Sequence, residues 1–376
     1  MAARTAPPFR ADHVGSLLRP VEVAEARERF EAGLIPAEEL RAIEDGAIRK
    51  AVKMQEEIGL QAATDGELRR RSWQGDFLFQ LGGVSTAAGE PSFPRDFRTA
   101  AGETLVPPQG TVRVDQRIEL THTIFGEDFK ALRSMTNSAI PKLTIPSPSM
   151  LYLRCGRGGI DEGVYPDLDE FWSDVVAAYA EEIRRLHELG CTYLQIDDVS
   201  LAMLNDPSLR AELAARGDDA DHLHLVFIRR LNEVLAHRPS GMAITAHMCR
   251  GNFRSAWAAT GSYEFVAESL FGELQVDGFF VEYDDERSGG FEPLRFVTGG
   301  RLAVLGLVTT KRGELEAKDE LKRRIDEASR YVPLDRLCLS PQCGFASNAA
   351  GGNDITYEQQ VEKLRLVVET AHEVWG

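Results

Sequence analysis

The feature that most constrains this chain is a regular alternation of short apolar runs with longer amphipathic, charged segments. Several of the apolar runs are almost continuous, as strands buried on both faces of a parallel sheet are, and the segments between them have helical periodicity. The expected strands cover residues 9–17, 60–66, 142–149, 192–198, 243–249, 277–285, 302–310 and 337–344. Eight successive strand-then-helix units predict an α/β fold of the (β/α)8 barrel type.

Long helical patterns at 36–59 and 168–190 each end in a glycine, Gly59 and Gly190, where a left-handed C-cap is expected. Further helices are expected at 220–236, 314–330 and 357–374.

One segment, about 75–136, departs from this rhythm. It is rich in Gly, Pro, Thr and Ser and then alternates in TVRVDQRIEL, which predicts a β-ribbon or lid inserted after the second strand. No linker separates two cores, so we expect residues 1–376 to form a single barrel domain with this insertion.

Charge and hydropathy restrict the partners. The formal net charge of −16 and the absence of a Lys/Arg-rich run argue against nucleic-acid binding. No stretch approaches the roughly 18 apolar residues that a membrane helix needs, and the N-terminus has no apolar targeting region, which favours a cytoplasmic protein without a membrane partner. Small molecules are the expected partners, with a homo-oligomer left open.

The five cysteines form an odd and widely spaced set: Cys155, Cys191, Cys249, Cys338 and Cys343. This pattern argues against a disulfide framework and leaves burial, metal binding or nucleophilic chemistry as their roles. Cys338 begins its strand, while Cys155 and Cys191 lie in a loop and just beyond a helix, so we interpret these three as structural.

Catalytic residues of a barrel come from the carboxyl ends of its strands. His247 and Cys249 stand at one such end with a spacing of two, so both side chains can point to the same face. By itself the pair is more often structural than metal-binding. Glu282 and Cys343 at the same end of other strands strengthen the interpretation, and a thiolate with an imidazole favours Zn²⁺.

Glu67 and Asp197 also follow apolar runs, and two carboxylates at a barrel mouth suit a substrate ammonium group. The alternative is that they form salt bridges with nearby arginines: Arg69, Arg70, Arg71 or Arg154. Other acids near strand ends are expected to cap the helices that follow: Asp198, Asp284 and Asp285. Arg250 and Asn252 could bind an anionic substrate group, or Arg250 could pair with a carboxylate.

Six segments in order resemble the cobalamin-independent methionine synthase family: RADHVGSLLRP, TDGELRRRSW, LQIDDVSLAM, HMCRGN, FFVEYDD and LSPQCGFAS. The resemblance covers essentially the whole chain and implies a (β/α)8 barrel. It implies four zinc ligands, which map onto His247, Cys249, Glu282 and Cys343. It further implies that homocysteine is bound at its carboxylate by Ser16 and at its amine by Glu67 and Asp197.

Two departures concern the methyl donor. The chain has no counterpart of the second barrel of full-length synthases, and VTTKRGELE stands where those enzymes have a His-containing loop thought to supply a proton. A zinc site with two thiolates favours thiol transfer over hydrolysis. We therefore expect zinc-dependent methyl transfer to a thiol such as homocysteine, giving methionine. The alternatives are epoxide opening with coenzyme M or another thiol, which resembles the epoxyalkane:coenzyme M transferases, and a zinc-containing barrel without turnover.

Overall fold

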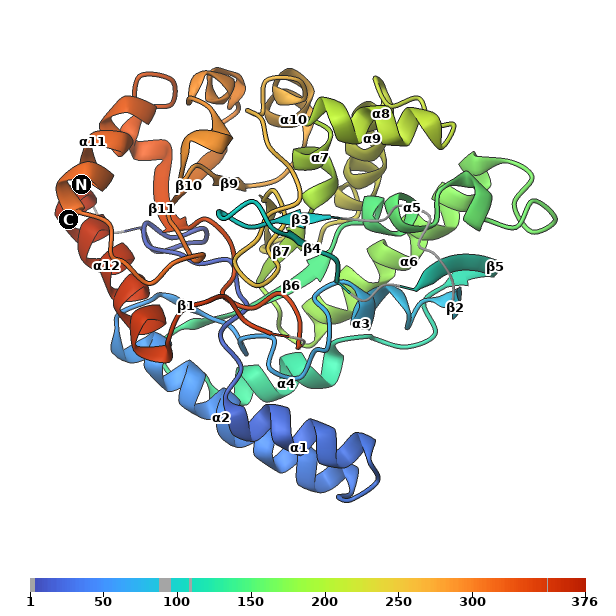
Figure 1. The fold of residues 1–376 in the computed structure, drawn as a ribbon, viewed down its shortest axis with the longest axis horizontal. Helices are drawn as coiled ribbons and strands as arrows, with labels where there is room; N and C mark the ends of the chain where they lie inside the picture. The colour runs from blue at the N-terminus through green and yellow to red at the C-terminus, as the bar shows by residue number, and fades with distance from the viewer. Residues whose placement is uncertain (1–3, 88–95, 108–109, 350) are drawn as a thin grey trace.

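A curled parallel sheet lies at the centre of the structure, a computed structural model that describes residues 4–87, 96–107, 110–349 and 351–376 (Figure 1). Within these residues the sheet has seven strands, each overlapping a predicted strand. In sheet order they are β1 (Ala62–Ala63), β6 (Ile140–Pro146), β7 (Tyr193–Asp197), β8 (Ala243–Met248), β9 (Gly278–Glu282), β10 (Leu302–Val308) and β11 (Leu337–Pro341). All six pairings between neighbours are parallel, as a barrel requires.

The predicted strand at 9–17 takes the eighth position without forming a regular ladder. Asp12 donates its backbone N–H to the carbonyl of Leu339 at 3.0 Å, and Leu17 donates to Gly66 at 3.0 Å, so the segment joins β11 to β1. The carboxylate of Asp12 accepts hydrogen bonds from two backbone N–H groups of its own segment, which therefore do not enter a ladder. An extended connection thus stands in place of a regular first strand and bridges β11 and the loop that follows β1.

Helices surround the sheet (Figure 1). The longer ones are α1 (Val21–Glu31), α2 (Ala37–Glu57), α4 (Gly126–Met135), α6 (Leu168–Glu188), α8 (Pro207–Ala215), α9 (Leu223–Leu235), α11 (Lys318–Ala328) and α12 (Tyr357–Trp375). Short helices are α3 (Gly75–Leu78), α5 (Ser149–Cys155), α7 (Val199–Met203) and α10 (Ala267–Glu273).

The ends of the long helices follow the sequence signals. Gly59 and Gly190 have positive φ angles of 93° and 97° just beyond α2 and α6, as predicted. Thr356 forms a capping box with Gln359 at the start of α12. In the part of the chain that the structure describes, no helix is both long and apolar enough to cross a bilayer.

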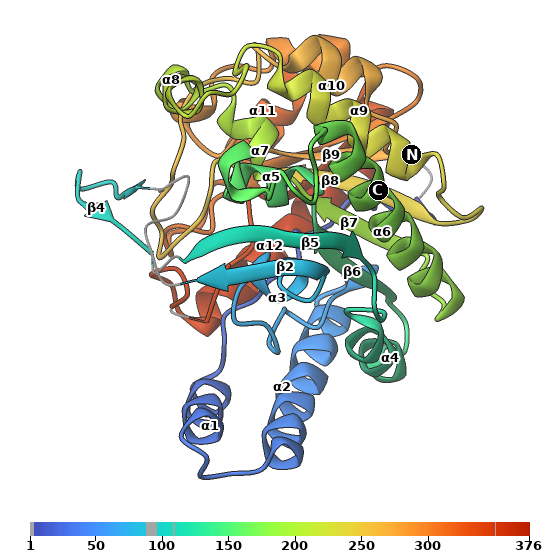
Figure 2. The same ribbon diagram turned by 90° about the vertical axis from the view of Figure 1, so that its right-hand side faces the viewer.

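The insertion between β1 and β6 contains an antiparallel ribbon, as predicted. β2 (Gly82–Ala87) pairs with β5 (Thr111–Glu119), and a smaller pair joins β3 (Phe97–Arg98) to β4 (Thr104–Leu105). β5 contacts α5 and α6, so the ribbon lies on the outside of the barrel (Figure 2). Part of the predicted insertion, residues 88–95 and 108–109, lies outside the described residues. A lid function for this insertion stays a prediction.

A buried ion pair occupies the barrel interior near the amino ends of the strands. Lys142 Nζ lies 3.1 Å from Asp12 Oδ1, and both side chains are fully buried. Tyr193 donates its hydroxyl to Asp12 Oδ2 at 2.8 Å. These contacts tie β6 and β7 to the extended segment that completes the barrel.

Candidate metal and substrate site

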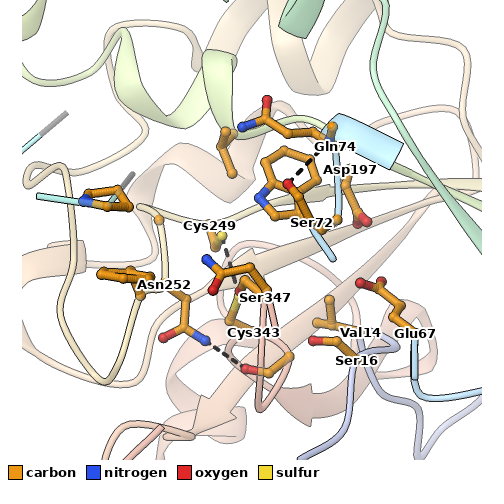
Figure 3. A pocket seen from close by; sticks show the side chains of 18 of the residues that line it. Val14, Ser16, Glu67, Ser72, Gln74, Asp197, Cys249, Asn252, Cys343 and Ser347 are labelled. Atoms are coloured by element: carbon orange, nitrogen blue, oxygen red, sulfur yellow. Dashed lines mark hydrogen bonds between the residues drawn. The ribbon is translucent and has the colours of Figure 1, made fainter. Parts of the chain in front are cut away.

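A cavity of about 220 Å³ opens at the carboxyl ends of the strands. Six of the seven residues predicted for the site line this cavity: Ser16, Glu67, Asp197, His247, Cys249 and Cys343. Figure 3 shows the carboxylates of Glu67 and Asp197 on one side and the sulfur atoms of Cys249 and Cys343 on another. The predicted substrate residues and most of the predicted metal ligands therefore face a common space.

Three of the four predicted ligands converge. One ligand atom each from His247, Cys249 and Cys343 lies within 4.8 Å of the other two, and all three residues are buried. His247 belongs to β8 and Cys249 follows it, with Met248 between them pointing into the apolar core. The period-two alternation of a strand thus directs both ligand side chains to one side, and Cys343 reaches them from the loop after β11.

The two site cysteines form a hydrogen-bonded pair rather than a disulfide. Both thiols are free, and Cys343 donates to Cys249 with 3.4 Å between the sulfur atoms. This hydrogen bond, followed by the nearby imidazole of His247, holds the pKa of Cys249 well below its usual range. The same hydrogen bond and burial raise the pKa of Cys343. Of the two thiols, Cys249 is therefore the one that ionises more readily.

The donor set fits a borderline-soft metal ion. Neither ring nitrogen of His247 has a hydrogen-bond partner in the described part of the chain, although the residue is buried. Burial lowers its pKa, but Cys249 and then Asp197 raise it overall. A buried imidazole without a hydrogen-bond partner beside two free cysteine side chains matches the His and Cys ligands that zinc prefers.

Glu282, the fourth predicted ligand, lies at the end of β9 but outside this three-residue group. Its Oε2 atom accepts a hydrogen bond from the backbone N–H of Arg250 at 2.7 Å. Its Oε1 atom has no hydrogen-bond partner within the described residues and lies 3.6 Å from Lys311 Nζ and 3.7 Å from Arg287 Nη2. Burial alone would raise the pKa of Glu282, but Lys311, followed by Arg250 and Arg287, lowers it, so the carboxylate is ionised. A role as fourth ligand stays a prediction.

Arg250 has a structural role, so the interpretation as an anion-binding residue is wrong. Its side chain is buried and does not line the cavity. The guanidinium donates to the carbonyl oxygen of Gly261 at 2.6 and 2.9 Å and to that of Glu282 at 3.1 Å. Arg250 therefore fixes the loop that follows β8 to the end of β9.

The acidic wall of the cavity is formed by Glu67 and Asp197. Asp197 ends β7 in register with His247 on β8. Burial and the nearby carboxylate of Glu67 raise the pKa of Asp197 to about 7, although His247 acts in the opposite direction. Glu67 lies 3.5 Å from Arg70, so the salt-bridge alternative is also realised.

Only one oxygen of Glu67 is used by the protein. Oε1 accepts a hydrogen bond from Thr144 Oγ1 at 2.8 Å, while Oε2 is buried with no hydrogen-bond partner among the residues described. Glu67 also has a φ of 57°, a backbone conformation that is uncommon outside glycine. An unsatisfied, ionisable oxygen beside a cavity is suited to a cationic ligand group.

Ser16 packs closely against the loop that carries Cys343. A Cβ atom placed on Gly344 would lie 1.9 Å from Ser16 Oγ, so only glycine allows this approach. The backbone N–H of Phe345 donates to the carbonyl of Ser16 at 2.9 Å. Ser16 is thus held between the predicted amine-binding acids and the predicted metal ligands.

Much of the cavity wall is formed by residues that no sequence pattern indicated. The additional lining includes Ser72, Trp73, Gln74, Gly75, Leu78, Phe79, Phe97, Pro107, Gly110, Phe253, Ser347 and Asn348. These residues lie on the insertion and on loops, which carry no periodic signal. Asn252, which was considered for anion binding, does line the cavity; its Nδ2 donates to the carbonyl of Gly344 at 2.8 Å.

The remaining three cysteines, Cys155, Cys191 and Cys338, are buried and free. Burial raises the pKa of each thiol to about 12. They have the character of inert core residues, in agreement with their structural interpretation.

Comparison with known proteins identifies the family. The sequence model of the family described as "Cobalamin-independent synthase, Catalytic domain" matches residues 160–373, more than half of the chain. The chain belongs to this family. Within it, the chain is 47% identical to the uncharacterized protein YxjH of Bacillus subtilis over 98% of its own length and 95% of that protein. It is 22% identical to a methionine synthase of Pyrococcus abyssi, covering 88% of this chain and 85% of that one.

Solved structures agree with the fold. A putative vitamin-B12 independent methionine synthase from Listeria monocytogenes is 39% identical, with a TM-score of 0.78 over 99% of this chain and 100% of that one. A B12-independent methionine synthase from Shewanella sp. W3-18-1 has a TM-score of 0.70 at 18% identity, covering 97% of both chains. The predicted barrel and the predicted family resemblance are thus both confirmed.

Proposed function

We propose that this member of the cobalamin-independent synthase family is a zinc-dependent methyltransferase that transfers a methyl group to homocysteine or a similar amino-acid thiol, giving methionine in the case of homocysteine. The main support is the convergence of His247, Cys249 and Cys343 beside a cavity that Glu67 and Asp197 also line. The names of relatives such as the Pyrococcus abyssi methionine synthase point to the same chemistry.

The metal would be held by His247, Cys249 and Cys343, with Glu282 as the proposed fourth ligand. When bound, zinc supplies Lewis acidity that lowers the pKa of a coordinated substrate thiol and makes it a thiolate at neutral pH. The thiolate ligands keep the site rich in negative charge, which favours a nucleophilic sulfur over hydrolytic chemistry.

The chain's own residues orient the amino acid. Glu67 Oε2 and the carboxylate of Asp197 bind the substrate ammonium, and Ser16 donates a hydrogen bond to the substrate carboxylate. Asp197 and His247 lie side by side in register on β7 and β8, so the ammonium and the sulfur of one small molecule can be held at neighbouring strand ends. Burial of these groups excludes water from the nucleophile and strengthens each electrostatic contact.

In the transfer step the substrate sulfur forms a bond to the methyl carbon, and the bond between that carbon and the donor breaks, leaving its electron pair on the donor. The chain contributes positioning: it holds the sulfur near one end of the cavity and leaves the remainder for the donor.

The two carboxylates of the cavity, Glu67 and Asp197, favour homocysteine methylation over epoxide opening with coenzyme M. Coenzyme M carries a sulfonate, and two buried carboxylates would repel an anion at that position. An amino-acid thiol places a cation there instead. The same two acids therefore favour homocysteine over a sulfonated thiol.

The test is turnover of purified, zinc-loaded protein. Homocysteine is supplied with methyl donors of three kinds, methyltetrahydrofolate, methylcobalamin and small methylated sulfur compounds, and labelled methionine is measured by mass spectrometry. We expect methionine from at least one donor and a strong loss of activity in Asp197→Asn. Product from coenzyme M and epoxypropane, without methionine from any donor, would overturn the proposal in favour of epoxide opening.

A further inference from the structure

Lys311 is a buried cation that the proposed chemistry does not use. Its side chain is 8% exposed, and Nζ has no hydrogen-bond partner in the ranges that the structure describes. Its close ionic contact is with Oε1 of Glu282 at 3.6 Å, and that oxygen is equally without a hydrogen bond. Two buried, oppositely charged groups thus face each other slightly beyond hydrogen-bond distance.

The backbone around Lys311 is anchored to the loop that carries the predicted ligand Cys343. Thr310 donates its backbone N–H and its hydroxyl to Oε1 of Gln342 at 2.9 and 2.8 Å. Gln342 directly precedes Cys343, so the backbone that carries Lys311 is held against the loop of that residue. Lys311 is therefore a buried residue next to the site and not a mobile surface side chain.

Glu282 is consequently placed between two kinds of partner. Lys311 Nζ and Arg287 Nη2 lie 3.6 and 3.7 Å from Oε1 of Glu282. The charge of Glu282 also raises the pKa of His247 and of Cys249, two of the three convergent ligand residues. Arg287 is shared, because its guanidinium also pairs with Asp285 and stacks over the ring of Trp257 at 4.0 Å. Lys311 Nζ, in contrast, has no hydrogen-bond partner among the described residues, and after Glu282 it is the charge of Asp284 that raises its pKa most.

We propose that Lys311 is a positioning residue that competes with a bound divalent cation for Oε1 of Glu282, and thereby weakens retention of the cation and eases replacement of Glu282 by the substrate sulfur. This inference rests on the proposed zinc site. It adds a role for a residue that neither binds the metal nor touches the substrate.

The direction of the effect follows from charge. An outer partner that accepts a hydrogen bond makes a ligand more basic and strengthens metal binding, whereas an outer cation makes a carboxylate less basic and repels the metal. Removing Lys311 should therefore tighten zinc binding. It should also raise KM for the thiol, because Glu282 Oε1 then has only Arg287, which is shared with Asp285, as an alternative partner when the sulfur arrives.

The experiment measures zinc affinity by competition with a chelating dye for the whole chain and four variants: Lys311→Met, Lys311→Arg, Glu282→Gln and the Lys311→Met/Glu282→Gln double variant. We expect Lys311→Met to bind zinc about tenfold more tightly, in the range typical of outer partners of metal ligands. Lys311→Arg, which keeps the charge, should restore weaker binding. The double variant should match Glu282→Gln, because Lys311 acts through that carboxylate.

Unchanged or weaker zinc binding in Lys311→Met would overturn the inference, as would an equal tightening in the Glu282→Gln background. Lys311→Gln provides a second neutral variant if Lys311→Met fails to fold. A wild-type chain that binds no zinc would instead overturn the proposed metal site itself, so the two failures are distinguishable.

Discussion

Binding of an amino-acid ligand should depend on the ionisation of Asp197. Burial and Glu67 raise the pKa of this carboxyl to about 7, so it carries its charge above that pH and loses the charge as the pH falls through it. The ammonium of methionine stays protonated between pH 6 and pH 8. Asp197 is ionised in roughly one tenth of molecules at pH 6 and roughly nine tenths at pH 8, which predicts about tenfold tighter binding at pH 8, or ~1.4 kcal/mol.

Isothermal titration calorimetry with methionine between pH 6 and pH 8 measures this dependence. Methionine has no thiol, so the substrate's own sulfur does not titrate. The matched control ligand is 4-(methylthio)butanoate, which lacks the amine and should bind without this increase. Asp197→Asn should bind methionine weakly with a flat profile. An affinity for methionine that is constant or falls with rising pH in the wild-type chain would refute the placement of the ammonium at Asp197.

Three further changes test other contacts. Gly344→Ala places a Cβ atom 1.9 Å from Ser16 Oγ, so KM for homocysteine should rise about tenfold with zinc content retained; an unchanged KM would show that Ser16 does not orient the substrate. Glu67→Gln removes the charge of an unpartnered buried oxygen and should weaken methionine binding by about 2 kcal/mol in calorimetry, whereas equal affinity would remove Glu67 from the amine site. Lys142→Met leaves Asp12 without its buried counter-ion and should lower the free energy of unfolding in urea by roughly 3–5 kcal/mol; a loss below about 1 kcal/mol would contradict the role given to this ion pair.

Much of the fold could be predicted because its signals are local. Seven apolar runs became strands, and Gly59 and Gly190 end α2 and α6 as their sequence positions indicate. The run at 9–17 looked equally strand-like, but Asp12 uses its own carboxylate to bind nearby N–H groups, and this competition depends on the folded arrangement. Hydrophobic periodicity does not report it.

In the candidate site, too, some features follow from local sequence and others only from tertiary structure. Strand alternation placed His247 and Cys249 on one side, and the position of strand ends brought Cys343 to them. The contact of Glu282 with Lys311, in contrast, depends on how the end of β9 and the loop after β10 come together in the folded chain. Charge pairing of this kind arises from tertiary structure, so no spacing rule could predict it.

Whether the site cysteines hold a metal is tested by the zinc content of the purified protein, measured by mass spectrometry. The wild-type chain should carry about one zinc ion, as a single four-ligand site does. Cys249→Ser and Cys343→Ser should each lose most of it, while Cys191→Ser, which changes a buried cysteine outside the cavity, should retain it. Equal zinc content in all four proteins would contradict the account.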